Sequence, residues 1–247
     1  MTDPVTISLI AATFFVAGGV KGIIGLGLPT ISLAVLTATI GLHPAMAMML
    51  APSLVTNVWQ AAVGGNGKAI IARIWPFLTM ATVTVWFGAE FLTRVDVSVL
   101  SALLGALLIA YALIGLIGIK FSISGSRERW AGPVVGAING VFTGMTGSFA
   151  VPGIPYLQAL GLPRDMLIQA MGMLFTASTV ALAVSLGGKN MLTAEMGAIS
   201  ISAVIPACVG MVIGQRARQK IPETVFRRVF YLALIVLGGY IIARSLT

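Results

Sequence analysis

Long apolar runs, separated by short polar or glycine-rich breaks, recur along the whole chain. The longer runs have about the 20 residues that an α-helix needs to span the hydrocarbon core of a bilayer. The pattern predicts an all-α integral membrane protein with a single transmembrane domain over residues 1–247. We expect about ten helical segments, at residues 5–24, 29–41, 44–63, 73–92, 97–119, 131–146, 150–161, 163–186, 192–213 and 223–245.

The composition supports a chain that lives in a membrane. Hydrophobic residues make up 58% of the 247 positions, charged residues make up 9%, and the mean hydropathy is +1.03. A soluble domain has about 25% charged residues, so this chain has too few polar side chains to cover a surface in water. The net charge of +8 is explained by basic cytoplasmic loops, and nucleic acid is not an expected partner.

The two halves of the chain repeat one motif. In each half a helix runs into a glycine-rich break, followed by a short helix and then by Gly-Leu and a proline. The first copy reads Gly-Ile-Ile-Gly-Leu-Gly-Leu-Pro at 22–29 and Gly-Leu-His-Pro at 41–44. The second reads Gly-Val-Phe-Thr-Gly-Met-Thr-Gly-Ser at 140–148 and Gly-Leu-Pro at 161–163.

The copies lie close to 120 residues apart, which indicates an internal duplication. We expect a first repeat at 5–119, a basic cytoplasmic linker at 120–130 and a second repeat at 131–247. The short segments, 29–41 and 150–161, have about twelve residues each, too few to span the bilayer as straight helices. Each glycine-rich pair therefore crosses twice or re-enters as a hairpin, and such irregular backbone is tolerated only where it lines a cavity.

The distribution of basic residues predicts the topology. If each glycine-rich pair crosses an even number of times, eleven basic residues face one side and three face the other. With single crossings the same residues would divide seven against seven, so the positive-inside rule favours the first arrangement. The two halves are then inverted relative to each other and both termini are periplasmic. The eleven are Lys68, Arg73, Lys120, Arg127, Arg129, Arg164, Arg216, Arg218, Lys220, Arg227 and Arg228, and the three are Arg94, Lys189 and Arg244.

Inversion predicts that the two glycine-rich tips enter from opposite faces and can meet near the midplane, the arrangement of many substrate sites in secondary transporters. Lys21, directly before the first break, is the one basic residue outside the loops. An ammonium group in hydrocarbon costs at least a few kcal/mol, so it needs a partner or a wet cavity. The sequence leaves two interpretations open: Lys21 binds an anion at the tip, or its side chain reaches the interface or a helix carbonyl.

Other polar residues extend this candidate site. Glycines at the breaks let backbone N–H groups approach a ligand, and the following helix N-termini favour anions; the same glycines also suit close helix packing. The hydroxyls and amides of the second tip and of the mid-helix positions can donate hydrogen bonds to substrate or to a neighbouring helix. The candidate substrate-binding residues are Lys21, Gly22, Gly25, Gly27, Asn57, Gln60, Asn139, Thr143, Gly144, Thr146, Gly147, Ser148 and Gln169.

Several kinds of chemistry are not expected. One cysteine (Cys208), one histidine and scattered acids cannot supply a metal site, and a disulfide framework is excluded. The sequence has no Walker motif, which argues against ATP-driven pumping. No base stands near a nucleophile in a recognisable pattern, so we expect neither an enzyme nor a cofactor.

At the repeated motifs the chain resembles the sulfite exporter TauE/SafE family, also called the TSUP transporters. The resemblance lies in 17–29 and 136–147, followed by Val151-Pro152 and Tyr156-Leu157, and it extends over essentially the whole chain in length, duplication and basic central loop. The family commonly has Gly-Gly-Gly where this chain has Gly-Leu-Pro at 27–29 and Gly-Ser-Phe at 147–149. The resemblance implies a multi-pass protein of the bacterial inner membrane that exports or takes up sulfite, sulfoacetate or other small sulfur-containing or organic anions.

The sequence therefore predicts a secondary transporter of small anions (sulfite, a sulfonate or a related organic anion) that works by alternating access. An anion channel and a non-transporting membrane subunit are the alternatives. The expected partners are the anionic substrate and the lipid bilayer, and a homo-oligomer is compatible with the sequence.

Overall fold

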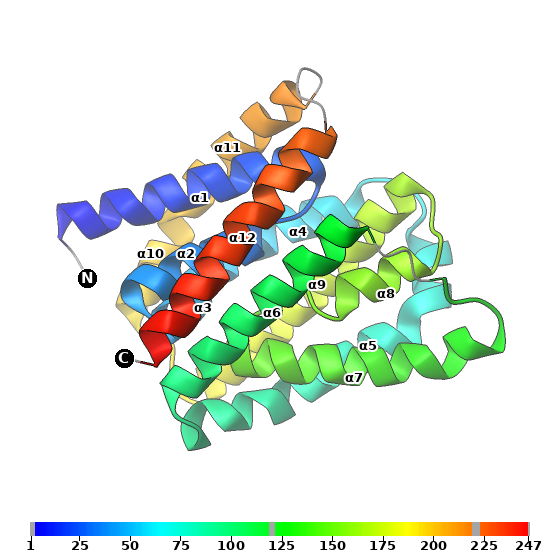
Figure 1. The fold of residues 1–247 in the computed structure, drawn as a ribbon, viewed down its shortest axis with the longest axis horizontal. Coiled ribbons are helices and arrows are strands. Elements are labelled where there is room, and N and C mark those ends of the chain that lie inside the picture. The colour runs from blue at the N-terminus through cyan, green and yellow to red at the C-terminus, as the bar shows by residue number, and fades with distance from the viewer. Residues whose placement is uncertain (1–2, 119–121, 219–222, 247) are drawn as a thin grey trace.

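The computed structural model describes residues 3–118, 122–218 and 223–246, and all regular secondary structure in these ranges is helical (Figure 1). Lys120 and Lys220, two of the basic residues assigned to the cytoplasmic side, lie outside the described residues. The helices are α1 (Pro4–Ile24), α2 (Leu28–Ile40), α3 (Leu42–Met48), α4 (Leu50–Ala62), α5 (Gly67–Arg94), α6 (Val97–Ile117), α7 (Ser126–Thr146), α8 (Gly153–Ala159), α9 (Arg164–Gly188), α10 (Ala194–Ser202), α11 (Val204–Ala217) and α12 (Glu223–Ser245).

Six stretches of helix in the described ranges are long and apolar enough to cross a membrane: α1, α5, α6, α9, α12 and the pair α10–α11. Their outer faces present apolar side chains, such as Phe87, Ile205 and Val236, which are 63%, 70% and 71% exposed. Exposed apolar side chains of this size are costly in water and suit contact with lipid. The prediction of an all-α, multi-pass membrane protein is confirmed.

The helix boundaries differ from the predicted segments at two prolines. The segment predicted at 44–63 is divided at Met49, and the one predicted at 192–213 is divided at Ala203. Pro52 has no N–H to donate to the Met48 carbonyl, so this carbonyl needs a hydrogen-bond donor from another part of the chain. The Ser200 hydroxyl donates to the Met48 oxygen at 2.8 Å and accepts from the Ala51 N–H at 3.0 Å. The Ser200 side chain of α10 thereby stabilises the break between α3 and α4.

The second short segment also differs. The prediction placed a helix at 150–161, whereas α8 has only seven residues. The backbone from 147 to 152 is non-helical, and it returns from the end of α7 to the start of α8. α2, by contrast, has 13 residues, close to the predicted length.

Glycines set the closest helix pairs. A Cβ on Gly18 of α1 would lie 2.1 Å from the Ala207 carbonyl oxygen of α11. A Cβ on Gly136 of α7 would lie 2.4 Å from the Phe77 carbonyl oxygen of α5. The two helices of each pair run in the same direction. In the first pair, for example, Gly18 contacts Ala207, and one turn later along both helices Gly22 contacts Met211. α6 and α12 pack as an antiparallel pair, since Gly105 contacts Gly238 and Gly115 contacts Tyr231.

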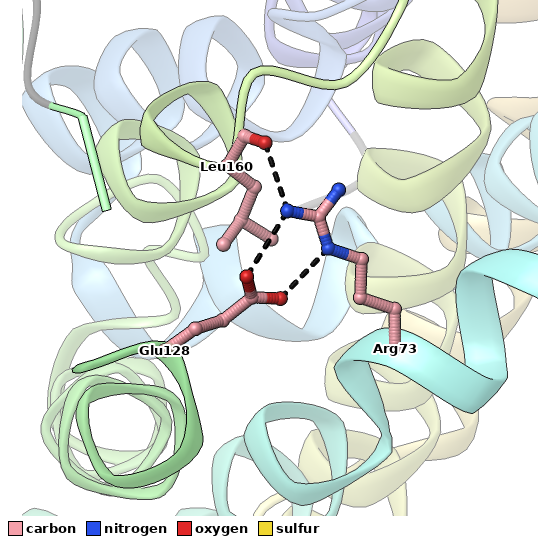
Figure 2. A network of polar contacts seen from close by, with 3 residues as sticks. All are labelled: Arg73, Glu128 and Leu160. Carbon is pink, nitrogen blue, oxygen red and sulfur yellow. Dashed lines mark hydrogen bonds and ion pairs between the residues drawn. The ribbon is translucent and has the colours of Figure 1, made fainter. Parts of the chain in front are cut away.

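Ionic contacts lie at opposite ends of α5. Near its start, the Arg73 guanidinium binds the Glu128 carboxylate of α7 through two hydrogen bonds of 2.7 and 3.0 Å and also donates to the Leu160 carbonyl at 3.0 Å (Figure 2). Near its end, Glu90 accepts from the Lys189 ammonium at 2.7 Å. The first turn of α1 and the last turn of α12 lie at the left of Figure 1, whereas α7 begins at the right and α12 begins at the top.

Candidate functional site

The first glycine-rich break ends α1 in a left-handed turn. Gly25 has φ 78° and donates from its backbone N–H to the Lys21 carbonyl at 2.8 Å, which closes the helix. Gly27, with φ 111°, precedes α2, and Pro29 lies in the first turn of that helix. Non-glycine residues rarely adopt such positive φ values, so these two glycines are needed for the turn itself.

Lys21 lies in the last turn of α1 and is buried, with only 3% of its surface exposed. Its ammonium group donates to the Thr56 hydroxyl at 3.2 Å and to the Asn57 side-chain oxygen. Both partners belong to α4, and both are neutral. Among the described residues no carboxylate forms an ion pair with Lys21, so its charge is balanced only by dipoles.

The face of α4 toward Lys21 has unused hydrogen-bond donors. Ser53, Thr56 and Asn57 are at most 1% exposed and lie within about one turn of one another. The Thr56 hydroxyl donates its own hydrogen to the Pro52 carbonyl at 2.8 Å. The Ser53 hydroxyl and the Asn57 amide nitrogen have no hydrogen-bond partner. Unpaired buried donors cost free energy, and one of these two belongs to Asn57, which contacts the ammonium.

The polar side chains of the second tip mostly bond its own backbone. The Thr143 hydroxyl donates to the Ser148 carbonyl at 3.0 Å. The Thr146 hydroxyl donates to the Phe142 carbonyl at 2.7 Å and accepts from the Ser148 N–H at 3.2 Å. These hydroxyls hold the non-helical segment in place.

Asn139 is the residue of the second tip that keeps a spare donor. Its side-chain oxygen accepts from the Gly153 N–H at 2.8 Å, while its amide nitrogen is buried without a partner. Asn139 directly precedes the repeat glycine, Gly140, as Lys21 precedes Gly22. The helix ends give a different correspondence: the Gly25 and Gly147 N–H groups donate to the Lys21 and Thr143 carbonyls, so Thr143 occupies the position of Lys21 and Asn139 lies one turn earlier.

The two tips lie against different helices. Gly25 is nearest to Ile168 of α9, and Gly147, with φ 74°, is nearest to Met46 of α3. The hydrogen bonds of Lys21 go to α4 and not to the second tip. The structure therefore brings Lys21 together with Asn57, one of the predicted site residues, and holds Asn139 in a separate environment with Gly153.

The remaining predicted residues have contacts between helices. Gln60 donates to the Ile168 carbonyl at 2.7 Å and Gln169 donates to the Ala61 carbonyl at 2.8 Å, so the two amides join α4 and α9 reciprocally. A Cβ on Gly22 or on Gly144 would lie 2.2 Å from a backbone oxygen of α11 or α5. At these two glycines the structure favours the packing interpretation.

Sequence reasoning missed Ser53 and Thr56. Their spacing offers a signal, because residues i and i+4 lie on the same face of a helix and Ser53 is four residues before Asn57. Serine and threonine are frequent in this chain, however, and only the contact with Lys21 distinguishes these two. Outside this site, a cleft of about 1190 Å³ lies between α6, α8 and α12, with Arg228 and Gln158 in its lining.

A bundle of apolar helices that encloses an ammonium without a counter-ion, beside a broken helix pair, is typical of membrane transport proteins. The chain belongs to the sulfite exporter TauE/SafE family, whose model matches residues 10–241. Members of this family are membrane transporters, not enzymes. No curated protein and no solved structure matches the chain.

Proposed function

We propose that the protein is a secondary transporter that moves a small anion, sulfite or a sulfonate, across the bacterial inner membrane by alternating access. The observation that carries the proposal is the buried Lys21 ammonium, with no acidic partner among the described residues and with two unused donors beside it. An anion would supply the missing charge and accept from those donors. A scaffold protein would gain nothing from such a group, because its burial is costly.

The helix pairings support two inverted repeats, 5–119 and 131–247, joined by a cytoplasmic linker at 120–130. α1, which opens the first half, packs in parallel on α11, and α7, which opens the second half, packs in parallel on α5. α6 and α12, which end the two halves, pack on each other in opposite directions. A two-fold axis in the membrane plane would relate these pairs and would place both termini on one side of the membrane, which the positive-inside rule makes the periplasm.

An ion pair at each end of α5 supports a transporter conformation that is closed on both sides of the membrane. The Arg73–Glu128 pair joins α5, α7 and the end of α8 on the side with most basic residues, and the Lys189–Glu90 pair joins α9 and α5 on the other. Lys21 is buried in this conformation. Alternating access would require the two contacts to open in turn.

Counterflow of labelled sulfite in proteoliposomes tests this function. A carrier accumulates label transiently against unlabelled anion on the other side, and the rate saturates with substrate. An anion channel conducts without counterflow, and a non-transporting subunit shows neither. Absence of counterflow for a panel of sulfite, sulfonates and small carboxylates, with folded protein, would refute the proposal.

A further inference from the structure

The cleft between α6, α8 and α12 lies at the ends of two candidate membrane spans, Val97–Ile117 and Thr224–Ser245. Its walls include Ile114 and Gly118 at the end of the first span and residues from Thr224 to Leu232 at the start of the second. The cleft therefore lies where the hydrocarbon core meets the headgroup region, on the side with most of the basic residues.

Fixed contacts shape the walls of this cleft. The Tyr231 ring packs on Gly115, where a Cβ would lie 2.2 Å from a ring carbon, and the Tyr231 hydroxyl accepts from Arg227 at 3.2 Å. The Ile123 N–H donates to the Ala159 carbonyl at 2.9 Å, which joins the segment after α6 to α8. The cleft has a volume of about 1190 Å³. Pockets for small organic ligands have roughly 300–1,000 Å³, so this one has room for a larger molecule.

One face of α12 gives the cleft a charged mouth and an apolar wall. Arg228 and Leu232 are four residues apart and share a face, and both line the cleft. Val225 and Val229, which also line it, are 59% and 60% exposed. At a rise of 1.5 Å per residue, Leu232 lies about 6 Å deeper in the span than Arg228. Such a wall suits a ligand with a charged head and a hydrocarbon tail.

The charge at the mouth is positive. Arg228 is exposed, and within the described part of the chain it forms no ion pair. No described residue in the lining of the cleft is acidic, and Ser122 and Gln158 add neutral hydrogen-bonding groups. A guanidinium group binds phosphate oxygens in pairs, so a phosphodiester is the headgroup chemistry that fits.

We propose that the cleft binds an anionic phospholipid of the cytoplasmic leaflet, with its phosphate at Arg228 and an acyl chain along Val229 and Leu232. Basic pockets between transmembrane helices on the cytoplasmic side are typical sites for such headgroups. The lipid joins the end of α6, α8 and the start of α12. The inference takes the proposed topology, in which this side is cytoplasmic, and it is independent of Lys21 and of the transported anion.

Native mass spectrometry of the delipidated full-length protein tests the charge preference. Phosphatidylglycerol, which is anionic, and phosphatidylcholine, which is zwitterionic, are compared with identical acyl chains, and the affinity of the first bound lipid is measured. We expect phosphatidylglycerol to bind about fivefold or more tightly, the advantage that one basic residue near the membrane surface provides. Equal affinity for the two lipids would overturn the inference.

A matched pair of arginine variants locates the preference. Arg228→Gln should weaken phosphatidylglycerol about fivefold and change phosphatidylcholine by less than about twofold. Arg216→Gln is the control, because Arg216 is an exposed arginine in the last turn of α11 and does not line the cleft. An equal loss in both variants would place the preference in the overall charge of this side and overturn the site.

Two tryptophan variants of α12 examine the acyl chain. Val229→Trp fills the apolar part of the cleft and should weaken both lipids about tenfold, the equivalent of about two lost methylene contacts. Val236→Trp is the control, since Val236 is 71% exposed and outside the cleft. Unchanged lipid binding in folded Val229→Trp protein would overturn the inference.

Glycerol phosphate distinguishes a lipid from a soluble phosphate compound. It has the head without the acyl chains, so an excess of about a hundredfold should leave phosphatidylglycerol bound. Displacement of the lipid would make the cleft a site for a soluble organic phosphate. A lipid-free dimer that Val229→Trp dissociates would give the cleft to a second copy of the chain. Either result would overturn the inference.

Discussion

The Asn57 side chain accepts a hydrogen bond from the Lys21 ammonium, although the two residues are 36 positions apart and lie on different helices. The contact fixes the end of α1 against the middle of α4 and leaves the amide nitrogen of Asn57 without a hydrogen-bond partner. It links α1, which ends at the first glycine-rich break, to α4. The ammonium is thereby held by dipoles instead of by a carboxylate, and its charge remains available to a bound anion.

Replacement of Lys21 should abolish transport without loss of the fold. In Lys21→Gln the amide keeps hydrogen bonds to α4 but has no charge, so anion binding should fall by at least about 100-fold, the equivalent of about 2.7 kcal/mol. Sulfite counterflow in proteoliposomes measures the loss. Lys189→Gln is the control, because Lys189 is an ion-paired lysine at the opposite end of α9 from the site. Wild-type counterflow in Lys21→Gln would remove Lys21 from the site.

Asn57→Asp should stabilise the protein and at the same time inactivate it. The new carboxylate would pair with the buried ammonium, which has no ionic partner at present, and would occupy the charge that an anion needs. We expect a rise in the apparent Tm, at about 2–4 °C per kcal/mol, together with loss of counterflow. Asn57→Leu, which removes the hydrogen bond and adds no charge, should lower the Tm. A more active Asn57→Asp protein would contradict the model of an anion at Lys21.

The glycines of the close helix pairs should tolerate no side chain. Gly18→Ala would place a methyl group 2.1 Å from the Ala207 carbonyl oxygen, and backbone cannot yield as a flexible side chain does. We expect a loss of several kcal/mol of stability, seen as poor yield and a lowered apparent Tm. Gly239→Ala is the control, since a Cβ at Gly239 meets no atom within 4 Å and alanine favours the helix by about 1 kcal/mol. Equal stability of the two variants would show that α1 and α11 can separate.

The sequence predicted the class of fold well, because apolar runs of bilayer length leave few alternatives. It also predicted which residues are expensive to bury, and Lys21 and Asn57 are indeed buried and in contact. The partners of those residues were harder to foresee. Gln60 and Gln169 look in the sequence like Asn57, yet they bond backbone carbonyls across α4 and α9. Which amide faces a helix and which a ligand depends on tertiary packing that periodicity does not encode.

The break at Met49 gives a second example. Pro52 marks the place where a carbonyl loses its partner, so a kink could be predicted. The compensating hydroxyl of Ser200 lies about 150 positions away in the chain, and no local pattern connects the two. The same holds for two glycines of the repeated motif, Gly22 and Gly144. Whether they serve helix packing or ligand contact depends on the helices packed against them, which the motif does not specify.

The proposed topology can be tested with single cysteines. Cys208 is the only cysteine, so a Cys208→Ser protein is a clean background for labelling. With both termini periplasmic, Ser245→Cys at the end of α12 should react with a membrane-impermeant maleimide in intact cells. Arg129→Cys, in the first turn of α7, should react only after the membrane is permeabilised. The reverse pattern would invert the topology, and labelling of both in intact cells would refute the pairing of the basic residues on one side.

The Arg73–Glu128 pair should control transport rate more than stability. The Arg73 side chain is 39% exposed, so the pair contributes no more than about 1 kcal/mol to folding. Its contacts nevertheless join three elements, α5, α7 and the end of α8 (Figure 2). Any opening between these elements must break the bidentate contact, so that Glu128→Gln should ease opening on this side. We expect the counterflow rate to change by at least about threefold while the apparent Tm shifts by less than about 4 °C.

Arg73→Lys distinguishes a gating role from simple charge balance. Lysine keeps the charge but cannot bind Glu128 and the Leu160 carbonyl through the same planar fork, so it should change the rate in the same direction as Glu128→Gln. If only the charge mattered, Arg73→Lys would transport as wild type. A large fall in Tm for either variant would instead assign the pair a structural role, because a contact that opens in every cycle cannot be one on which the fold depends.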